Sequence, residues 1–169
     1  HALLNQEDST GVSTFLIEPK VDTGKIIDQL KIEITKDDNY GSLSKKLSKA
    51  GADLIESSIN KCLYHSSELT EQDNSMATLA PKISKDDLKI NWNDKSDIIL
   101  AQVKAFSPTP GAFTTINSKR LKIFKAESIN NDNNHEIGSI YNVDKNFFVF
   151  LCGQNALRLF NVQLEGKKA

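Results

Sequence analysis

The chain has 169 residues, 38% of them hydrophobic and 25% charged, which is enough for one ordinary domain or two small ones. Its net charge of −1 hides a contrast, because residues 1–81 carry −5 (eight Lys, thirteen acidic) and residues 82–169 carry +4 (thirteen Lys or Arg, nine acidic). Without an apolar run long enough to cross a bilayer, a signal-like start or a metal-ligand spacing of Cys and His, the sequence excludes membrane-spanning and metal-site classes. It predicts a cytoplasmic monomer without a metal, in which Cys62 and Cys152 are buried free thiols.

The first expected elements are two strands joined by a tight turn. Residues 11–18 are rich in Val, Thr, Phe and Ile, and residues 25–34 end in an alternating pattern of isoleucine and leucine. The turn between them reads Val-Asp-Thr-Gly at 21–24, so a carboxylate, Asp22, stands on a loop just beyond a strand. Binding and catalytic residues are concentrated on such loops.

A long amphipathic helix is expected next. Leu43, Leu47, Ala50 and Leu54 recur at helical spacing, and Ile59 and Cys62 continue the pattern for about six turns in all. We interpret this stripe as core rather than as a cofactor site. The polar residues 66–78 that follow are expected to cross the surface as a connection.

Two shorter helices are expected before the sequence changes to short strands. Ser84 is placed to cap the first, with two aspartates at its positive end. The second follows Ser96, has Ile99, Val103 and Phe106 on one face, and ends before the prolines of a rigid turn at 106–111. Trp92, just ahead of it, is expected to anchor a core rather than to stack on a base.

The last third of the chain predicts short strands separated by Asn- and Asp-rich turns. Five such strands within about fifty residues indicate a small closed or partly closed barrel. The expected strands are 112–116, 120–126, 138–143, 147–151 and 156–164.

Several segments, taken in order, resemble the methionyl-tRNA formyltransferase family. They are 10–15 (Thr-Gly-Val-Ser-Thr-Phe), 21–24, 80–87 (Ala-Pro-Lys-Ile-Ser-Lys-Asp-Asp), 90–92 (Ile-Asn-Trp) and 105–111 (Ala-Phe-Ser-Pro-Thr-Pro-Gly). The resemblance implies an α/β fold followed by a small all-β domain. Residues 1–81 would be the C-terminal part of a Rossmann-like catalytic domain, 82–111 a linker with junction helices, and 112–169 an OB-type barrel that binds tRNA.

The activity implied by this resemblance is transfer of a formyl group from 10-formyltetrahydrofolate to the α-amine of methionyl-tRNA, which serves translation initiation. The family's catalytic group is an Asn, a His and an Asp. Asp22 matches the Asp, whereas no Asn-x-His precedes it in this sequence and His1 lies too close to the turn to fill that place. The family also continues beyond the Gly-Lys-Lys-Ala run at 166–169. We therefore expect an incomplete fragment that is inactive alone.

The resemblance also assigns roles to the turn. Asp22 would hold and charge the family's histidine and, through water, help remove a proton from the amine, because a carboxylate beside an imidazole favours the charged ring. Backbone groups of the same loop would bind the pterin ring of the folate, from Glu18, Pro19, Lys20, Val21, Asp22 and Gly24. From the turn alone, the favoured interpretation of Asp22 is a turn aspartate that caps neighbouring amides, and the surrounding segments of the resemblance reverse that preference.

The basic residues of the second half are the expected tRNA contacts. In an alternating strand Arg120, Lys122 and Phe124 face one way, and Leu121, Ile123 and Lys125 face the other. An OB-type domain commonly binds nucleic acid on such a basic face, and phosphate contacts would make the binding sensitive to salt. The set comprises Lys82, Lys85, Lys89, Lys119, Arg120 and Lys122, and the competing interpretation is a solvated surface.

Two other classes of function remain open. One is a related folate enzyme, such as a formyltetrahydrofolate hydrolase, a dehydrogenase module or a sugar-nucleotide formyltransferase, since these share the Asp turn and much of the linker. The other is a nucleic-acid-binding module without catalysis, which would bind through residues 82–169 alone and need no folate site.

Overall fold

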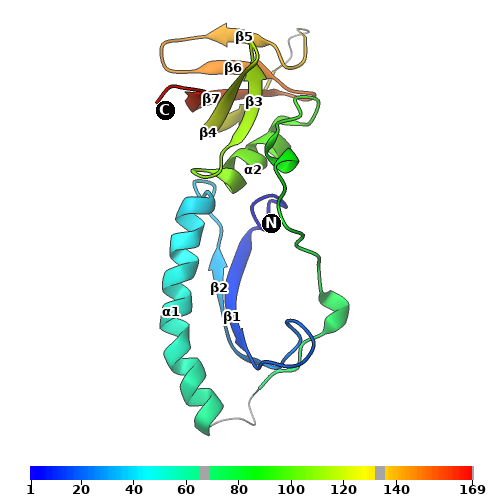
Figure 1. Ribbon diagram of the computed structural model, residues 1–169, viewed down its shortest axis with the longest axis vertical. Coiled ribbons are helices and arrows are strands. Elements are labelled where there is room, and N and C mark those ends of the chain that lie inside the picture. Colours follow the sequence, from blue (N-terminus) through cyan, green and yellow to red (C-terminus); the bar gives the residue numbers. More distant parts are fainter. Residues whose placement is uncertain (65–68, 132–135, 169) are drawn as a thin grey trace. The chain divides into compact units, whose positions relative to one another are not determined.

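The computed structural model describes residues 1–64, 69–131 and 136–168, and within them the chain forms two sheets and two α-helices (Figure 1). Two short 3-10 helices, Asn74–Met76 and Asp86–Leu88, lie between the α-helices. The elements in chain order are β1 (Ser9–Phe15), β2 (Ile26–Glu33), α1 (Tyr40–Tyr64), α2 (Ser96–Phe106), β3 (Ala112–Ile116), β4 (Lys119–Ile129), β5 (Ile140–Val143), β6 (Phe148–Leu151) and β7 (Ala156–Leu164).

The chain divides into two compact units, and each combines segments that are distant in sequence. Unit 1 comprises His1–Gln6, Asp37–Gly41 and Lys82–Ala169. Unit 2 comprises Glu7–Lys36 and Ser42–Pro81. The first residues of the chain and the start of α1 therefore belong with the C-terminal sheet.

Unit 2 is an antiparallel hairpin with a long helix along one face. β1 pairs with β2 in a register that sets Val12 opposite Leu30 and Thr14 opposite Asp28. α1 runs beside this hairpin (Figure 1). The two are close at Gly51, since a Cβ on this glycine would lie 3.9 Å from Val12 Cγ1. The two strands and the helix occur where the sequence predicts them. The sheet of this unit is antiparallel and has two strands, so its membership of a Rossmann-like domain stays a prediction from resemblance.

The helix buries a narrower stripe than the sequence predicts. Leu43, Ala50, Leu54 and Ser58 are buried, whereas Ile59 is 53% exposed. Cys62 is exposed as well, so its predicted burial is wrong. A hairpin of two strands offers a narrow surface, and it covers only the residues of α1 that point straight at it.

Unit 1 is built around a five-stranded antiparallel sheet in the order β3-β4-β7-β6-β5. α2 packs against β4, β7 and β3, where Ile99, Val103 and Phe106 meet Ile123 and Leu157 in the main core. Val149, Leu151 and Ala156 form a second, smaller cluster, since neighbouring residues of a strand point to opposite faces. The apolar face predicted for α2 and the five predicted strands are confirmed.

A closed barrel is not found among the described residues, because β3 and β5 end the sheet unpaired with each other. The outer edge of β3 is occupied by another segment. The amide of Ile90 donates to the carbonyl of Phe113 at 2.8 Å, and Lys89 pairs with Phe113 in a parallel bridge. This contact occupies the edge of β3 at Phe113, where β5 would have to pair to close a barrel.

Trp92 is a core anchor, as predicted. Its ring stacks on Phe150 with 4.5 Å between centroids, and its indole N–H donates to Thr114 Oγ1 at 3.0 Å. Trp92 therefore ties the segment before α2 to both β3 and β6.

Candidate functional site

Asp22 lies in the loop between β1 and β2, where the sequence places it. Its φ is 54°, in the left-handed region that Asp and Asn tolerate better than most residues. The side chain is exposed, and its carboxylate forms no hydrogen bond or ion pair with any residue that the structure describes. The carboxylate is therefore free to meet a ligand, and it is not used to cap the amides of its own turn.

The backbone around Asp22 is held from both sides. Gln72 donates its side-chain amide to the carbonyls of Asp22, at 3.0 Å, and Gly24, at 2.7 Å. The amide of Leu16 bonds the carbonyl of Lys25 at 3.0 Å and closes the base of the loop. The loop thus presents a free carboxylate on a pinned main chain.

Gly24 is required where it stands. It is buried, and a Cβ at this position would lie 1.7 Å from the carbonyl oxygen of Leu16. Any other residue would force the two ends of the loop apart.

The segment that supplies Gln72 is fixed beside the start of β2. Thr70 and Ile26 exchange two backbone hydrogen bonds, at 2.8 and 3.0 Å. Lys25 pairs with Glu71 at 2.7 Å, and the hydrogen bond that its ammonium donates to the Glu71 carboxylate is the main reason that the pKa of Lys25 lies above its usual value. Sequence reasoning missed Gln72 because it stands in a polar stretch without periodicity.

Apart from the buried Gly24, the other residues expected at the folate site are at the surface of the loop. Glu18, Pro19, Lys20 and Val21 are exposed, and Val21 is 83% exposed. Ile17, just before them, is 96% exposed. Two exposed apolar side chains in the same loop as a free carboxylate give the loop a surface able to contact a flat, partly apolar ligand.

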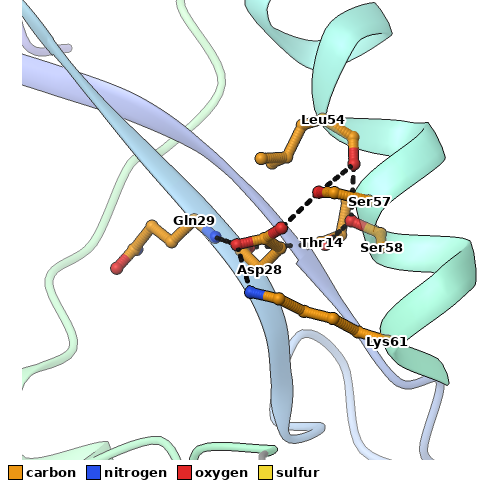
Figure 2. Close-up of polar contacts among 7 residues, drawn as sticks. All are labelled: Thr14, Asp28, Gln29, Leu54, Ser57, Ser58 and Lys61. Carbon is orange, nitrogen blue, oxygen red and sulfur yellow. Dashed lines mark hydrogen bonds and ion pairs between the residues drawn. The ribbon is translucent and has the colours of Figure 1, made fainter. Parts of the chain in front are cut away.

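A second carboxylate, Asp28 on β2, is engaged on all sides (Figure 2). One of its oxygens accepts from Lys61 Nζ at 2.9 Å and from the amide of Gln29 at 3.0 Å, and the other accepts from the hydroxyl of Ser57. The hydrogen bond from Ser57, followed by that from Lys61, lowers the pKa of Asp28 below its ordinary value. Beside it, Thr14 Oγ1 and Ser58 Oγ are 2.6 Å apart.

This cluster positions α1 on the hairpin and has no catalytic role, because both oxygens of the Asp28 carboxylate already accept hydrogen bonds from protein donors. The Asp22 carboxylate, by contrast, stays available for a ligand. Asp28 and Lys61 are 33 residues apart on different elements, and no sequence pattern could have paired them.

The six basic residues expected to contact tRNA lie in unit 1 at two places. Lys82, Lys85 and Lys89 are exposed in the segment before α2, and Lys119 and Arg120 are exposed at the start of β4. None of the six forms an ion pair with the residues that the structure describes.

On β4, Arg120 and Lys122 share a face with Phe113 of β3. Lys122 stands opposite Phe113 in the register, and the Arg120 guanidinium carbon lies 4.4 Å from the centroid of its ring. Leu121 and Ile123 are buried on the other face, as the alternation predicts. The prediction that Lys125 joins them is wrong, because the register shifts on both sides of Lys125 and leaves it exposed.

In the described ranges, no group of three or more His, Cys, Asp or Glu side chains could hold a metal ion. The helices of those ranges include none with the length and apolar content needed to span a bilayer.

A family model described as "Formyl transferase, C-terminal domain" matches residues 82–169. Two curated proteins named methionyl-tRNA formyltransferase are similar over 168 residues, with 34% identity for the one from Staphylococcus aureus (strain MW2) and 36% for the one from Kosmotoga olearia. Each alignment covers 99% of this chain and 54% of the relative, so the chain spans about half the length of the curated relatives it matches. The solved structure of WlaRD, a sugar 3N-formyl transferase in the presence of dTDP and 5-N-formyl-THF, has a TM-score of 0.68 at 25% identity and covers 99% of this chain and 59% of that one.

Proposed function

Because the chain belongs to the family defined by the formyl transferase C-terminal domain, we propose that it is part of an enzyme that moves a formyl group from 10-formyltetrahydrofolate to the α-amine of methionyl-tRNA. The names of the two curated relatives support the acceptor. Formylation of the initiator tRNA would place the enzyme in translation initiation. We further propose that it is cytoplasmic and monomeric.

The observation that carries the proposal is the free carboxylate of Asp22 on a pinned loop. Formyl transfer needs an amine that has lost a proton, a stabilised oxyanion and a proton for the leaving nitrogen. Asp22 would accept the amine proton through water and would hold an imidazole in its charged form. The exposed loop residues 18–21 and Gly24 would supply the folate contacts, and the apolar side chains of Ile17 and Val21 suit a pterin ring.

The tRNA would be bound by unit 1. Lys82, Lys85 and Lys89 would lie along the acceptor arm, while Lys119, Arg120 and Lys122 would meet phosphates from the sheet. Their ammonium and guanidinium groups have no acidic partner among the described residues, which leaves them available for phosphate.

The finer architecture belongs to the same proposal. Residues 1–81 would complete a Rossmann-like domain, 82–111 would link it to the sheet, and 112–169 would be an OB-type fold in an open form. Five antiparallel strands with a bulged β4 support the OB-type assignment.

Replacement of Asp22 by Asn in the enzyme that contains this sequence tests the proposal. The variant is expected to fold normally and to lose at least about 99% of turnover with methionyl-tRNA, as removal of a group acting in proton transfer does. Asp53→Asn, an exposed carboxylate on α1, is the matched control and should retain activity. Turnover of Asp22→Asn near that of the wild type would remove Asp22 from the mechanism.

The runner-up is a sugar-nucleotide formyltransferase, which the similarity to WlaRD favours. An acceptor assay separates the two, with methionyl-tRNA in one arm and an amino-sugar nucleotide in the other, both with 10-formyltetrahydrofolate. Formylation of the sugar alone would overturn the proposed acceptor and leave the role of Asp22 intact.

A further inference from the structure

Unit 1 contains a cavity of about 490 Å³, and of its lining residues only Lys85 has a role in the function proposed above. Its walls come from four stretches of the chain: the N-terminal turn, the first residue of α1, residues 83–88, and the end of α2 with the turn after it. All of them belong to unit 1. The volume lies in the range of sites for small ligands.

The walls are fixed by hydrogen bonds that need no ligand. Gln102 donates its side-chain amide to the carbonyls of Asp87, at 2.7 Å, and Lys89, at 3.2 Å, which holds the 83–88 wall against α2. Within that wall, Ser84 donates its amide and hydroxyl to the Asp87 carboxylate, at 2.6 and 2.8 Å. The cavity is therefore preformed.

Tyr40, the aromatic wall, is held by its neighbour. The amide of Gly41 donates to the carbonyl of Ser107 at 3.0 Å, and a Cβ on Gly41 would lie 2.6 Å from Pro108 Cδ. Only a glycine allows α1 to start this close to the turn that follows α2. Tyr40 is 48% exposed, so its ring still has surface to offer a ligand.

The lining combines apolar surface with a few free polar groups. Leu4, Ile83 and Phe106 supply apolar wall, and Phe106 is buried in the main core. The Tyr40 phenol, the Lys85 ammonium and the Thr109 hydroxyl make no hydrogen bond or ion pair within the described part of the chain. A flat ring that carries a negative charge matches such a lining, because the ring can stack on Tyr40 and the charge can meet Lys85.

We propose that this cavity binds a nucleotide, with the base between Tyr40 and the apolar wall and the phosphate at Lys85. Asp86 and Asp87 follow Lys85, and the Asp87 carboxylate accepts hydrogen bonds from Ser84. Lys82 and Lys89 add positive charge to the same segment. An uncharged apolar ligand would leave Lys85 unused. The nucleotide is either an unpaired residue of an RNA or a free mononucleotide, and the RNA source rests on the proposed function.

The test is binding of 5′-AMP to the 169-residue chain, followed by calorimetry and by NMR shifts of the residues that line the cavity. Tyr40→Ala is expected to weaken binding about tenfold, the usual loss when a base-stacking ring is removed. Lys85→Ala should weaken it about fivefold and flatten its salt dependence, and adenosine should bind more weakly than AMP and be indifferent to Lys85→Ala.

Matched controls are Tyr64→Ala, an exposed tyrosine at the far end of α1, and Lys95→Ala, an exposed lysine of unit 1 outside the lining. Both should bind AMP like the wild type. Tyr40→Phe keeps the ring and should retain most of the affinity, so a folding defect in Tyr40→Ala does not decide the result. Absence of AMP binding at millimolar concentration, or unchanged affinity in both Tyr40→Phe and Tyr40→Ala together with Lys85→Ala, overturns the proposal.

The source of the nucleotide is read by competition with a short single-stranded RNA. Displacement of AMP by the RNA identifies an unpaired nucleotide of the substrate, and no displacement identifies a free mononucleotide. Failure of the proposed function would appear separately, as absence of formyl transfer with AMP binding intact.

Discussion

The two cysteines of this chain have the same chemistry in opposite surroundings. Cys152 is buried at the end of β6, and burial, reinforced by the negative charge of Asp97, raises the pKa of its thiol to about 12. Cys62 is exposed near the end of α1. Only the thiolate is a nucleophile, so Cys152 is inert at neutral pH.

This contrast predicts the outcome of thiol labelling. At pH 8 the native chain should react with one equivalent of 5,5′-dithiobis(2-nitrobenzoate), at Cys62, and with two equivalents in guanidinium chloride. Cys62→Ser should leave the native chain almost unlabelled. Rapid native labelling of that variant would mean that Cys152 is accessible.

Asp28 carries the second prediction at this scale, for stability rather than reactivity. Since its pKa is lowered in the folded chain by Ser57 and Lys61, the ionised carboxylate stabilises the fold above the unfolded pKa of about 3.9. That contribution is lost as the pH falls through the lower, folded pKa. Asp28→Asn should cost about 1 kcal/mol at pH 7, because it weakens charge-assisted hydrogen bonds at a partly exposed site.

Urea unfolding followed across pH checks this prediction. The difference in unfolding free energy between wild type and Asp28→Asn should be constant near neutrality and shrink below about pH 4. Asp53→Asn on the exposed side of α1 should show a small difference at every pH. A gap that persists to low pH would assign the effect to packing instead.

At the scale of elements, the periodicity of α1 predicts more buried side chains than the neighbouring hairpin covers. Leu54 is buried, while Ile59, which belongs to the same predicted stripe, is 53% exposed. Leu54→Ala should therefore cost about 2 kcal/mol through lost packing. Ile59→Ala should change stability by no more than about 0.5 kcal/mol, as substitutions at exposed positions usually do.

Urea unfolding of unit 2, followed by the helical signal and by hydrogen exchange of α1, measures both variants. Equal losses for Leu54→Ala and Ile59→Ala would show that the exposed face of the helix is covered in solution. The pair is matched, since each change truncates one aliphatic side chain on the same helix.

Elements could be predicted from the sequence because their signals are local. The alternation around Ile123 and the helical spacing of Ile99 and Val103 depend on side chains a few residues apart. β3, β7 and α2 lie at the positions that such patterns predict. The turn at Asp22 is likewise predicted from Gly24, two residues later in the sequence. These features need no knowledge of the partner that packs against them.

Features that depend on partners distant in sequence could not be predicted. Gln72 reaches the Asp22 loop across 50 residues, and Asp28 meets Lys61 across 33. The contact of Ile90 with Phe113 on the edge of β3 is of the same kind, because nothing in the strand pattern indicates it. Tertiary hydrogen bonds decided each of these points.

At the scale of the whole chain, the two units differ in the core that supports them. Unit 1 packs a helix on a five-stranded sheet around Ile99, Ile123, Leu157 and their neighbours. In the described residues of unit 2, the buried hydrophobic side chains are Leu43, Ala50 and Leu54. A two-stranded hairpin with so small a core is marginal in water.

This imbalance predicts what happens when the chain is divided after residue 81. Residues 82–169 should fold alone, with Trp92 still stacked on Phe150 and its fluorescence blue-shifted as in the whole chain. Their stability should be lower than that of unit 1 in the whole chain, because Leu4 no longer packs against the core and the hydrogen bond from Gly41 to Ser107 is lost. Residues 1–81 should be largely unfolded, with little amide dispersion in NMR spectra. A cooperative unfolding transition in the 1–81 piece would mean that its hairpin and helix hold more stability than their buried residues account for.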